Sequence, residues 1–289
     1  IVTDENDCVT GWSYKKDKRD FYYKNLVNAG LYVIDKSAFP HTGGEKTDLE
    51  KDIIIPKIES GRVYAYNSSE YVKDIGTPER LRLVEADYKN KVPQNRNLKN
   101  KQKCIFLDRD GTINRYVGFL REEKEMELLP GAAEAIRRIN ESEYLAVCVT
   151  NQPVIARGEV TYQKLDNINN KMHTLLGEAG AYLNGLYYCP HHPDKGFKGE
   201  VAALKIDCDC RKPKTGLIKK AAERFNIDLE NSCFIGDTYT DVCTGINAGT
   251  KTVLLKSGAA DKVEKHKCEP DFTADNLLEA INIILGGKL

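Results

Sequence analysis

The sequence lacks the features that mark membrane proteins and nucleic-acid-binding proteins. Its 43 Lys and Arg residues balance 43 Asp and Glu residues, so no basic excess favours a nucleic acid or an anionic membrane surface as partner. No apolar run approaches the roughly 20 residues that a membrane-spanning helix needs, and the N-terminal residues do not form a secretory signal. We therefore expect a cytoplasmic globular protein. Because the chain begins with Ile1 rather than Met, we also expect its natural start to lie upstream.

Cysteine is not scarce, but its nine copies make an odd number that suits a framework of disulfides poorly. Cys104, Cys148 and Cys233 lie in apolar runs and are expected to be small buried side chains. The cysteines within residues 189–210 are different, because they stand in short pairs with each other or with histidine. A reducing compartment with a metal site fits this usage better than disulfides do.

Composition divides the chain into three parts. Residues 89–102 carry basic residues among Asn and Gln with almost no apolar content, which predicts a solvated linker between residues 1–88 and residues 103–289. In the last part, apolar runs alternate with helical patterns, which predicts an α/β fold with a parallel sheet and helices on both faces. The expected strands are residues 103–107, 144–151, 186–189, 232–237 and 251–255.

The first 88 residues show shorter patterns. Alternation predicts strands at Val27–Ile34 and Gly61–Tyr66, and residues 71–81 predict a strand, a turn and a helix with proline at its first position. A helix capped by Asp is expected at Asp48–Ile58. In this order, the stretches resemble the C-terminal half of sugar-1-phosphate nucleotidyltransferases, so the region is interpreted as a partial nucleotidyltransferase-like α/β piece.

That resemblance also identifies a missing part. The family's glycine-rich nucleotide loop, whose backbone amides would hold the phosphates, has no counterpart in this sequence. We therefore expect residues 1–88 to be a remnant or a docking module rather than a working nucleotidyltransferase. In the family, the residue that matches Asn28 contacts the sugar and the residue that matches Asp74 helps to hold a metal ion; here Asp74 is expected to be an ordinary turn acid.

Polar residues end several of the expected strands in the second half of the chain. They are Asp108, Asp110, Thr150, Asn151, Asp237 and Asp241, with Arg211 and Lys212 before a helix. Because the carboxyl ends of parallel strands meet at one edge of a sheet, we expect these side chains to converge. Acids so close together repel each other unless a cation offsets their charge. We expect a Mg²⁺ site formed by Asp108, Asp110, Asp237 and Asp241.

These residue types suit the hydrolysis of a phosphate ester. Asp108 would attack phosphorus to give an aspartyl-phosphate, and Asp110 would protonate the leaving oxygen and later activate water. Thr150 and Lys212 would donate hydrogen bonds to phosphoryl oxygens. The magnesium ion would offset charge on the transferring group.

A second metal site is predicted by Cys-x-His and Cys-x-Cys pairs that flank a short loop. Its expected ligands are Cys189, His191, Cys208 and Cys210, which would give a closed tetrahedral zinc site. His192 is a competing ligand, but His191 has the matching position. Four protein ligands leave no open position, so we expect a structural role, which includes fixing the residues that follow Cys210.

The motifs identify a family. Asp108-Arg109-Asp110-Gly111-Thr112, Thr150-Asn151, Lys212 and Gly236-Asp237 with Asp241 match, in order, the four motifs of haloacid-dehalogenase (HAD) superfamily phosphatases. The resemblance covers residues 103–285 and implies a Rossmann-like HAD domain. The zinc loop and residues 150–158 are most similar to the D-glycero-D-manno-heptose 1,7-bisphosphate 7-phosphatases, which have a minimal cap. The histidinol-phosphate phosphatases are close relatives of that subfamily.

The resemblance to the subfamily implies a set of substrate contacts. They are Tyr116, Val117, Gly118, Phe119, Asn151, Gln152, Pro153, Arg157 and Arg211. Arg211 would read a second phosphate or the sugar hydroxyls. The sequence departs from its relatives in two places: Pro153-Val154 replaces a usual Ser-Gly pair, and Thr238 stands where a Lys is common.

The favoured function is therefore a Mg²⁺-dependent phosphatase acting on a sugar phosphate, most simply heptose 1,7-bisphosphate. The nucleotidyltransferase-like piece supports this pathway, because removal of the 7-phosphate leaves the 1-phosphate that a transferase would activate. The alternatives are a histidinol-phosphate phosphatase, a bifunctional nucleotidyltransferase and phosphatase if the chain extends upstream, and a non-catalytic scaffold that binds a partner transferase. The scaffold is disfavoured, because it has no need to hold like charges together.

Overall fold

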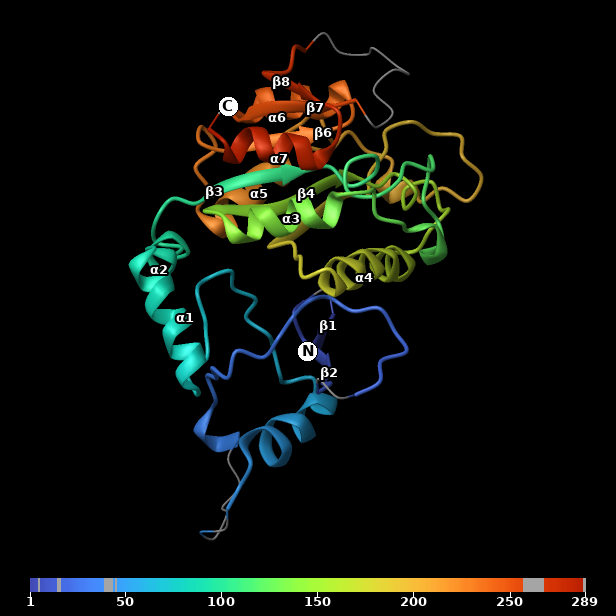
Figure 1. Ribbon diagram of the computed structural model, residues 1–289. Helices are drawn as coiled ribbons and strands as arrows, with labels where there is room; N and C mark the ends of the chain where they lie inside the picture. Colours follow the sequence, from blue (N-terminus) through green and yellow to red (C-terminus); the bar gives the residue numbers. More distant parts are fainter. Residues whose placement is uncertain (5, 15–16, 39–43, 45, 257–267, 288–289) are drawn as a thin grey trace.

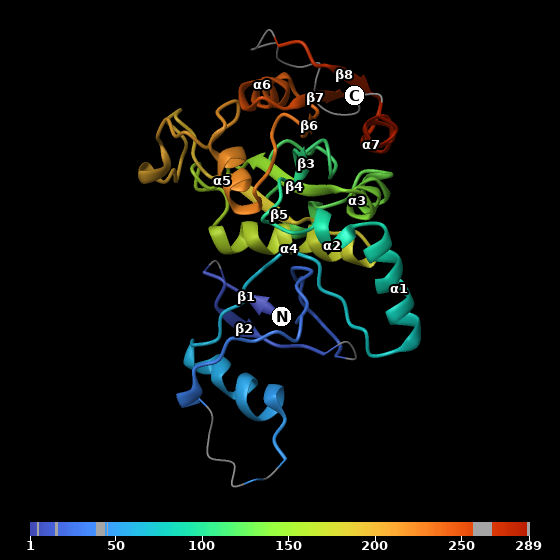
Figure 2. The same cartoon turned by 90° about the vertical axis from the view of Figure 1, so that its left-hand side faces the viewer.

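The structure is a computed structural model that describes residues 1–4, 6–14, 17–38, 44, 46–256 and 268–287. Its largest element is a parallel sheet, in the upper part of Figure 1. The sheet has six strands in the order β5-β4-β3-β6-β7-β8 (Figure 2). The strands are β3 (Lys103–Leu107), β4 (Tyr144–Asn151), β5 (Gly185–Cys189), β6 (Cys233–Gly236), β7 (Lys251–Leu255) and β8 (Phe272–Ala274). The predicted α/β class and parallel sheet are confirmed.

Five helices cover the two faces of the sheet. They are α3 (Ala132–Glu141), α4 (Tyr162–Glu178), α5 (Gly216–Phe225), α6 (Tyr239–Ala248) and α7 (Leu277–Leu285). Figure 2 shows α5 and α6 on one side of the strands and α3 and α7 on the other. Alternation along β3 sends Ile105 and Leu107 into the cluster with α3, α4 and α7, and Phe106 into the cluster with α5. Both faces are covered, as the continuous apolar runs predict.

Strand register brings the carboxyl ends of three strands together. Leu107 at the end of β3 pairs with Cys148 of β4 on one side and with Ile235 of β6 on the other. The chain leaves β3 toward β4 and later returns to pair β6 with the opposite edge of β3, so β3 is the topological switch point. Ligands of open α/β sheets bind in the crevice beyond the carboxyl ends of strands at such a point.

The N-terminal part has less regular structure than its sequence predicts. Its elements are β1 (Val2–Thr3), β2 (Val9–Gly11), η1 (Lys36–Ala38), η2 (Leu49–Ile54), η3 (Ile55–Ser60) and α1 (Pro78–Lys89). The strands predicted at Val27–Ile34, at Gly61–Tyr66 and at the start of residues 71–81 are wrong; in these stretches, the described residues form only a bridge between Tyr64 and Cys8. Val33 is fully exposed, because no neighbouring strand or helix covers this alternating face.

Two helix starts in this part follow their predicted signals. The Asp48 carboxylate accepts hydrogen bonds from the backbone of Glu50 and Lys51, although the helix that follows is a π-helix, η2, rather than an α-helix. Pro78 is the first residue of α1, and the Thr77 hydroxyl accepts from the Arg80 amide at 3.3 Å. Local capping signals therefore predict these two helix starts correctly, whereas the alternating patterns in this part do not predict strands correctly.

The segment expected to be a solvated linker is bound to the domain that follows it. It contains a short helix, α2 (Val92–Asn95). The buried Arg96 side chain donates to the carbonyls of Asn140 and Ser142 at 3.0 Å each. Gln102 is also buried and donates to the carbonyls of two residues in its own segment. The composition does predict its surface position, but the Arg96 side chain attaches it to the residues that follow.

Within the described residues, no helix combines the length and the apolar character needed to cross a membrane.

Candidate active site

Three buried carboxylates meet beyond the ends of β3 and β6. Asp108 follows β3 directly, Asp237 follows β6, and Asp241 lies in the first turn of α6. One oxygen from each of these residues lies within 4.8 Å of one from each of the others. Their residues are at most 8% exposed. The predicted convergence of these three acids is confirmed.

Two glycines allow the carboxylates to approach this closely. Gly111 has a φ of +89°, and a Cβ added there would lie 2.2 Å from an Asp237 carboxylate oxygen. A Cβ added at Gly236 would lie 2.3 Å from the Asp241 Cβ. Side chains at either position would collide with an acid, so glycine is required for the close approach rather than only for the turn.

Lys212 lies among the same acids. Its ammonium nitrogen forms an ion pair with Asp108 at 2.7 Å and donates a hydrogen bond to Asp241 at 2.5 Å. Its backbone is held by Asn151, which donates to the Lys212 carbonyl at 3.2 Å and accepts from the Lys212 amide at 3.0 Å. Burial alone would lower the pKa of Lys212, but Asp108 and Asp241 more than reverse this, so its pKa rises and the ammonium stays charged.

The charge balance of the cluster fits a divalent cation. Three carboxylates face one ammonium, and burial raises the pKa of Asp108 to about 6, with Lys212 lowering it and Asp241 raising it further. Holding like charges this close in a buried site is unfavourable without a counter-ion. Oxygen donors are the ligands that Mg²⁺ prefers. Asp108, Asp237 and Asp241 would hold the ion, which would supply positive charge to the transferring phosphoryl group.

Asp110 lies apart from the three clustered carboxylates. Its carboxylate is not among the grouped ligand atoms and instead accepts from Arg109, Asn114 and Gln152, so the expectation that Asp110 shares the magnesium site stays a prediction. Burial raises the pKa of Asp110, but the charge of Arg109 and these hydrogen bonds lower it more, leaving it below its ordinary value. The Arg109 guanidinium, which also donates to Asn169 of α4, holds the carboxylate in this orientation.

Thr150 and Gln152, at and just beyond the end of β4, face the same site. Both are buried, and the Gln152 amide donates to the Thr150 hydroxyl at 3.1 Å and to Asp110 at 2.8 Å. Gln152 was predicted only as a substrate contact, and its bond to Asp110 was missed. The roles of Arg109, Asn114 and Asn169 around Asp110 were also missed, because a sequence motif does not show which way a side chain turns.

The predicted substrate residues lie in loops near this edge. Tyr116 and Val117 are 50% and 38% exposed, and Gly118 has a φ of +81° in the same loop. The Arg157 guanidinium carbon lies 4.2 Å from the centroid of the Phe119 ring and 4.4 Å from that of Phe197. Arg157 thus connects the loop after the first acids with the loop that carries the cysteine cluster. These contacts show which loops the residues connect, and the role of the residues in substrate binding stays a prediction.

The two departures from related sequences have structural roles. Pro153 and Val154 are buried, and Val154 packs with Ile155 in a small apolar cluster. Thr238 is the N-cap of α6, and its hydroxyl donates to Asp241 at 2.6 Å. A β-hydroxyl therefore holds one of the three clustered carboxylates at this position.

The second predicted metal cluster is also assembled. A ligand atom from each of Cys189, His191, Cys208 and Cys210 lies within 4.8 Å of one from each of the others. The sulfur atoms are 3.2 to 3.5 Å apart, and His191 Nδ1 is 3.3 Å from the Cys210 sulfur. These separations are close to the roughly 3.7 Å expected of ligands around a tetrahedral zinc ion. The cluster could hold zinc, and Arg211 next to it donates to the His191 carbonyl at 3.2 Å.

His192, the competing ligand, lies outside the cluster. It is buried, and its Nδ1 accepts from the Asp194 amide at 3.2 Å. Cys104, Cys148 and Cys233 are buried as predicted. The structure pairs Cys243 of α6 with Cys268 in a disulfide, which the odd cysteine count and the metal motifs did not predict.

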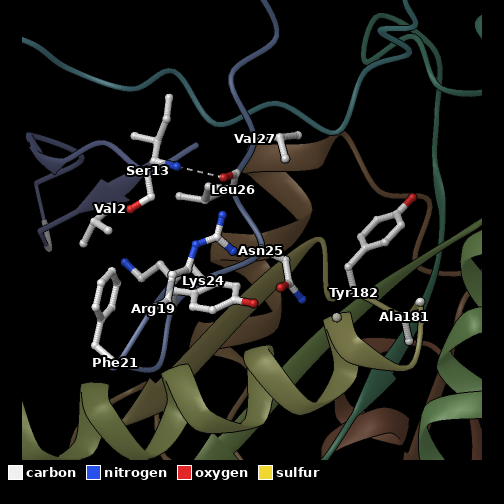
Figure 3. Close-up of a pocket in the computed structure, with 14 residues that line it drawn as sticks. Val2, Ser13, Arg19, Phe21, Lys24, Asn25, Leu26, Val27, Ala181 and Tyr182 are labelled. Atoms are coloured by element: carbon white, nitrogen blue, oxygen red, sulfur yellow. Dashed lines mark hydrogen bonds between the residues drawn. The ribbon is translucent and has the colours of Figure 1, made fainter. Parts of the chain in front are cut away.

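A separate cavity of about 300 Å³ lies between the N-terminal segment and the end of α4 (Figure 3). Its lining includes Arg19, Lys24 and Asn25 on one side and Ala181 and Tyr182 on the other. None of the carboxylates described above lines it, so the candidate chemistry does not extend into this cavity.

Fold and acid cluster together define a HAD-like phosphatase. A family model described as HAD-hydrolase-like matches residues 209–280. The D-glycero-β-D-manno-heptose-1,7-bisphosphate 7-phosphatase of Pasteurella multocida is 37% identical over 188 residues, which make up 65% of this chain and 99% of the relative. The enzyme of that name from Haemophilus influenzae is 40% identical, over 63% of this chain and 96% of its own. The chain belongs to the HAD-like phosphatases and is homologous to these heptose bisphosphate phosphatases, which indicates a phosphoric monoester hydrolase.

A solved structure agrees with these relatives. The D,D-heptose 1,7-bisphosphate phosphatase of B. bronchiseptica, complexed with magnesium and phosphate, matches with a TM-score of 0.57 at 30% identity. The match covers 64% of this chain and 99% of that one. The nucleotidyltransferase-like interpretation of the first 88 residues and the division into domains stay predictions.

Proposed function

We propose that this chain is a Mg²⁺-dependent phosphatase that removes the 7-phosphate from D-glycero-D-manno-heptose 1,7-bisphosphate. The observation that carries the chemistry is the meeting of Asp108, Asp237, Asp241 and Lys212 at the switch point of the sheet. The substrate is supported by relatives of that name, almost all of whose length this chain matches.

In the first half-reaction, an Asp108 oxygen attacks phosphorus while the bond from phosphorus to the C7 oxygen of the sugar breaks. Lys212 and Thr150, which are both buried beside the acids, donate hydrogen bonds to the phosphoryl oxygens. The negative charge of the bound phosphate would raise the pKa of Asp110 from its lowered value in the free site, and Asp110, once protonated, would give its proton to the departing oxygen. The products of this step are the heptose 1-phosphate and an acyl phosphate on Asp108.

In the second half-reaction, water attacks the same phosphorus and the acyl phosphate bond to Asp108 breaks. Asp110, now ionised, takes the proton of the attacking water and so returns to its starting state. Arg109 beside it favours the ionised form, since the guanidinium contributes to the lowered pKa of Asp110. Inorganic phosphate is the second product, and the cycle balances.

The non-reacting end of the substrate would lie among the loops near Phe119, Arg157 and Arg211. Arg211 is a candidate for the 1-phosphate, because a planar guanidinium presents paired donors that match phosphate oxygens. Its bond to the His191 carbonyl links its position to the cysteine cluster. The zinc ion that this cluster is proposed to hold would therefore act on substrate binding only by fixing the loop.

The N-terminal part is proposed to be a nucleotidyltransferase remnant or docking module. Its support is the order of its sequence motifs and the chemistry of the product, because heptose 1-phosphate is what such a transferase would activate. The part contacts the phosphatase region through Tyr23 and Asn25, which bond Thr174 and His173 of α4.

The direct test measures phosphate release from heptose 1,7-bisphosphate with and without Mg²⁺, beside histidinol phosphate as a competing substrate. We expect magnesium-dependent release with heptose 1-phosphate as the sugar product, and a much smaller rate on histidinol phosphate. The Asp108→Asn variant should lose nearly all turnover, because its amide is a poor nucleophile. Preference for histidinol phosphate, or turnover without a divalent ion, would refute the proposal.

A further inference from the structure

Arg109, between the two catalytic candidates in sequence, has a completely buried side chain. Its guanidinium binds both oxygens of Asp110, with the terminal nitrogen 2.8 Å from one and 3.1 Å from the other. The other terminal nitrogen donates to Asn169 of α4 at 2.9 Å. The side chain thus joins the loop after β3 to a helix 60 residues further along the chain.

The Asp110 carboxylate is held at both of its oxygens. One accepts from Arg109 and, at 2.9 Å, from Asn114; the other accepts from Arg109 and, at 2.8 Å, from Gln152. Donors on both oxygens fix the plane of the carboxylate. Proton transfer requires such control, because a general acid must lie within hydrogen-bond reach of the leaving oxygen.

Asn169 is the anchor that fixes Arg109. It is 4% exposed and lies on α4, well away in sequence from the other groups that surround Asp110. A buried guanidinium needs acceptors for its donors, and Asn169 supplies one on the side opposite Asp110. Removing that acceptor would leave a buried N–H group unsatisfied and free the guanidinium to rotate.

We propose that Arg109 and Asn169 are positioning residues that aim the Asp110 carboxylate for proton transfer to the leaving group. This rests on the proposed function, since it assigns a geometry to the acid of that reaction. Neither residue touches the phosphorus or the bond that breaks. Their loss should therefore matter most for substrates whose leaving oxygen needs a proton.

The test compares two aryl phosphates in the full-length protein with saturating Mg²⁺. Phenyl phosphate has a poor leaving group that depends on general acid catalysis, whereas p-nitrophenyl phosphate has a good one. In the Asn169→Leu variant, which has similar volume and no acceptor, we expect kcat/KM to fall about tenfold for phenyl phosphate and less than about threefold for p-nitrophenyl phosphate. Arg109→Lys, which keeps the charge but loses the fork, should show the same split.

The controls separate positioning from general damage. Asn169→Asp keeps an acceptor oxygen for Arg109 and should restore most of the lost phenyl phosphate activity. Gln163→Ala removes an amide from the exposed face of the same helix and should leave both rates near wild type. If Asn169→Leu does not fold, as judged by circular dichroism, the Arg109→Lys result decides the question.

Equal losses on both esters, or no loss, in folded Asn169→Leu or Arg109→Lys protein would overturn the inference. Failure of this inference is distinguishable from failure of the proposed substrate. If wild-type protein hydrolyses aryl phosphates but not heptose bisphosphate, the proposed substrate is refuted, but the two variants can still be compared on phenyl phosphate and p-nitrophenyl phosphate. Wild-type protein that hydrolyses neither would overturn both.

Discussion

At the scale of single residues, Gly111 decides whether the acids can meet. It follows Asp110 in a left-handed conformation, and its missing side chain leaves room for the Asp237 carboxylate. The adjacent acids are unremarkable in chemistry, since each is an ordinary Asp. Their environment sets them apart: burial raises the pKa of Asp108, Lys212 lowers it, and the nearby Asp241 raises it further.

Gly111→Ala should therefore weaken Mg²⁺ binding by about tenfold or more, equivalent to roughly 1.4 kcal/mol, because the new Cβ displaces Asp237. Gly249→Ala is a matched control: Gly249 has a φ of +77° with nothing within 4 Å of an added Cβ. It should lose about 1 kcal/mol of stability from backbone strain alone and keep its magnesium affinity. Calorimetric titration with Mg²⁺ measures the magnesium affinity of each variant, and equal affinities in the two variants would contradict this role of Gly111.

Magnesium binding should also depend on pH through Asp108. Because the metal needs the ionised carboxylate and the pKa of Asp108 is raised to about 6, affinity should fall about tenfold per pH unit below 6 and level off above about 7. The stability of the metal-free protein should instead fall as pH rises through about 6, since the folded chain binds the Asp108 proton more tightly than the unfolded chain does. A magnesium affinity that does not change between about pH 7 and pH 5 would disprove the assignment.

At the scale of elements, the loop from Cys189 to Cys210 carries the four ligands of the proposed zinc site. The thiol of Cys189 has its pKa raised by burial and by Cys210, and burial raises the pKa of Cys210 to about 11. Thiols in this state are protonated at neutral pH, so zinc binding should release protons and weaken as pH falls.

Cys208→Ser should abolish stoichiometric zinc binding and lower the Tm by about 5 °C or more, because a structural site contributes folding energy. Activity should fall as well, since Arg211 and Lys212 follow the cluster directly. Cys8→Ser changes a free thiol in the N-terminal part and serves as the control. Metal analysis by mass spectrometry with thermal melting gives both quantities, and full zinc occupancy in Cys208→Ser protein would exclude the ligand set.

Helix α4 contacts both Arg109 and the N-terminal segment. Asn169 reaches Arg109, while the next turn binds the N-terminal segment through the His173 carbonyl and the Thr174 hydroxyl. A Cβ at Gly177 would lie 2.3 Å from the Asn25 amide oxygen. Glycine is a poor helix former, so its use near the end of α4 follows from this close approach.

Gly177→Ala should therefore have two opposite effects. Alanine favours the helix by up to about 1 kcal/mol, but displacement of Asn25 should break its bond to His173 and loosen the segment around Tyr23. Hydrogen exchange should show faster exchange in residues 21–27 with α4 unchanged or slower. Glu178→Ala, at an exposed neighbouring position, should leave the segment protected. Unchanged protection in Gly177→Ala protein would show that the contact is not needed for docking.

At the scale of the whole molecule, the sequence predicts the sheet and most of the acid cluster because both follow from local patterns. Asp108 and Asp237 stand directly after apolar strands, and parallel strands must bring such ends together. The orientation of Asp110 could not be predicted, because it depends on Asn169, 60 residues from Arg109. The strand predicted at Val27–Ile34 is wrong because alternation indicates a strand only where another strand is available to pair with it.

The central claim is that Asp108 carries the phosphoryl group during turnover. Rapid acid quench with ³²P-labelled heptose bisphosphate, followed by peptide mapping, tests it most directly. We predict a hydroxylamine-sensitive phosphopeptide that contains Asp108, formed only with Mg²⁺ and absent from the Asp108→Asn variant. Substrate turnover with no labelled protein at any quench time, or with the label on a different residue, would contradict the account.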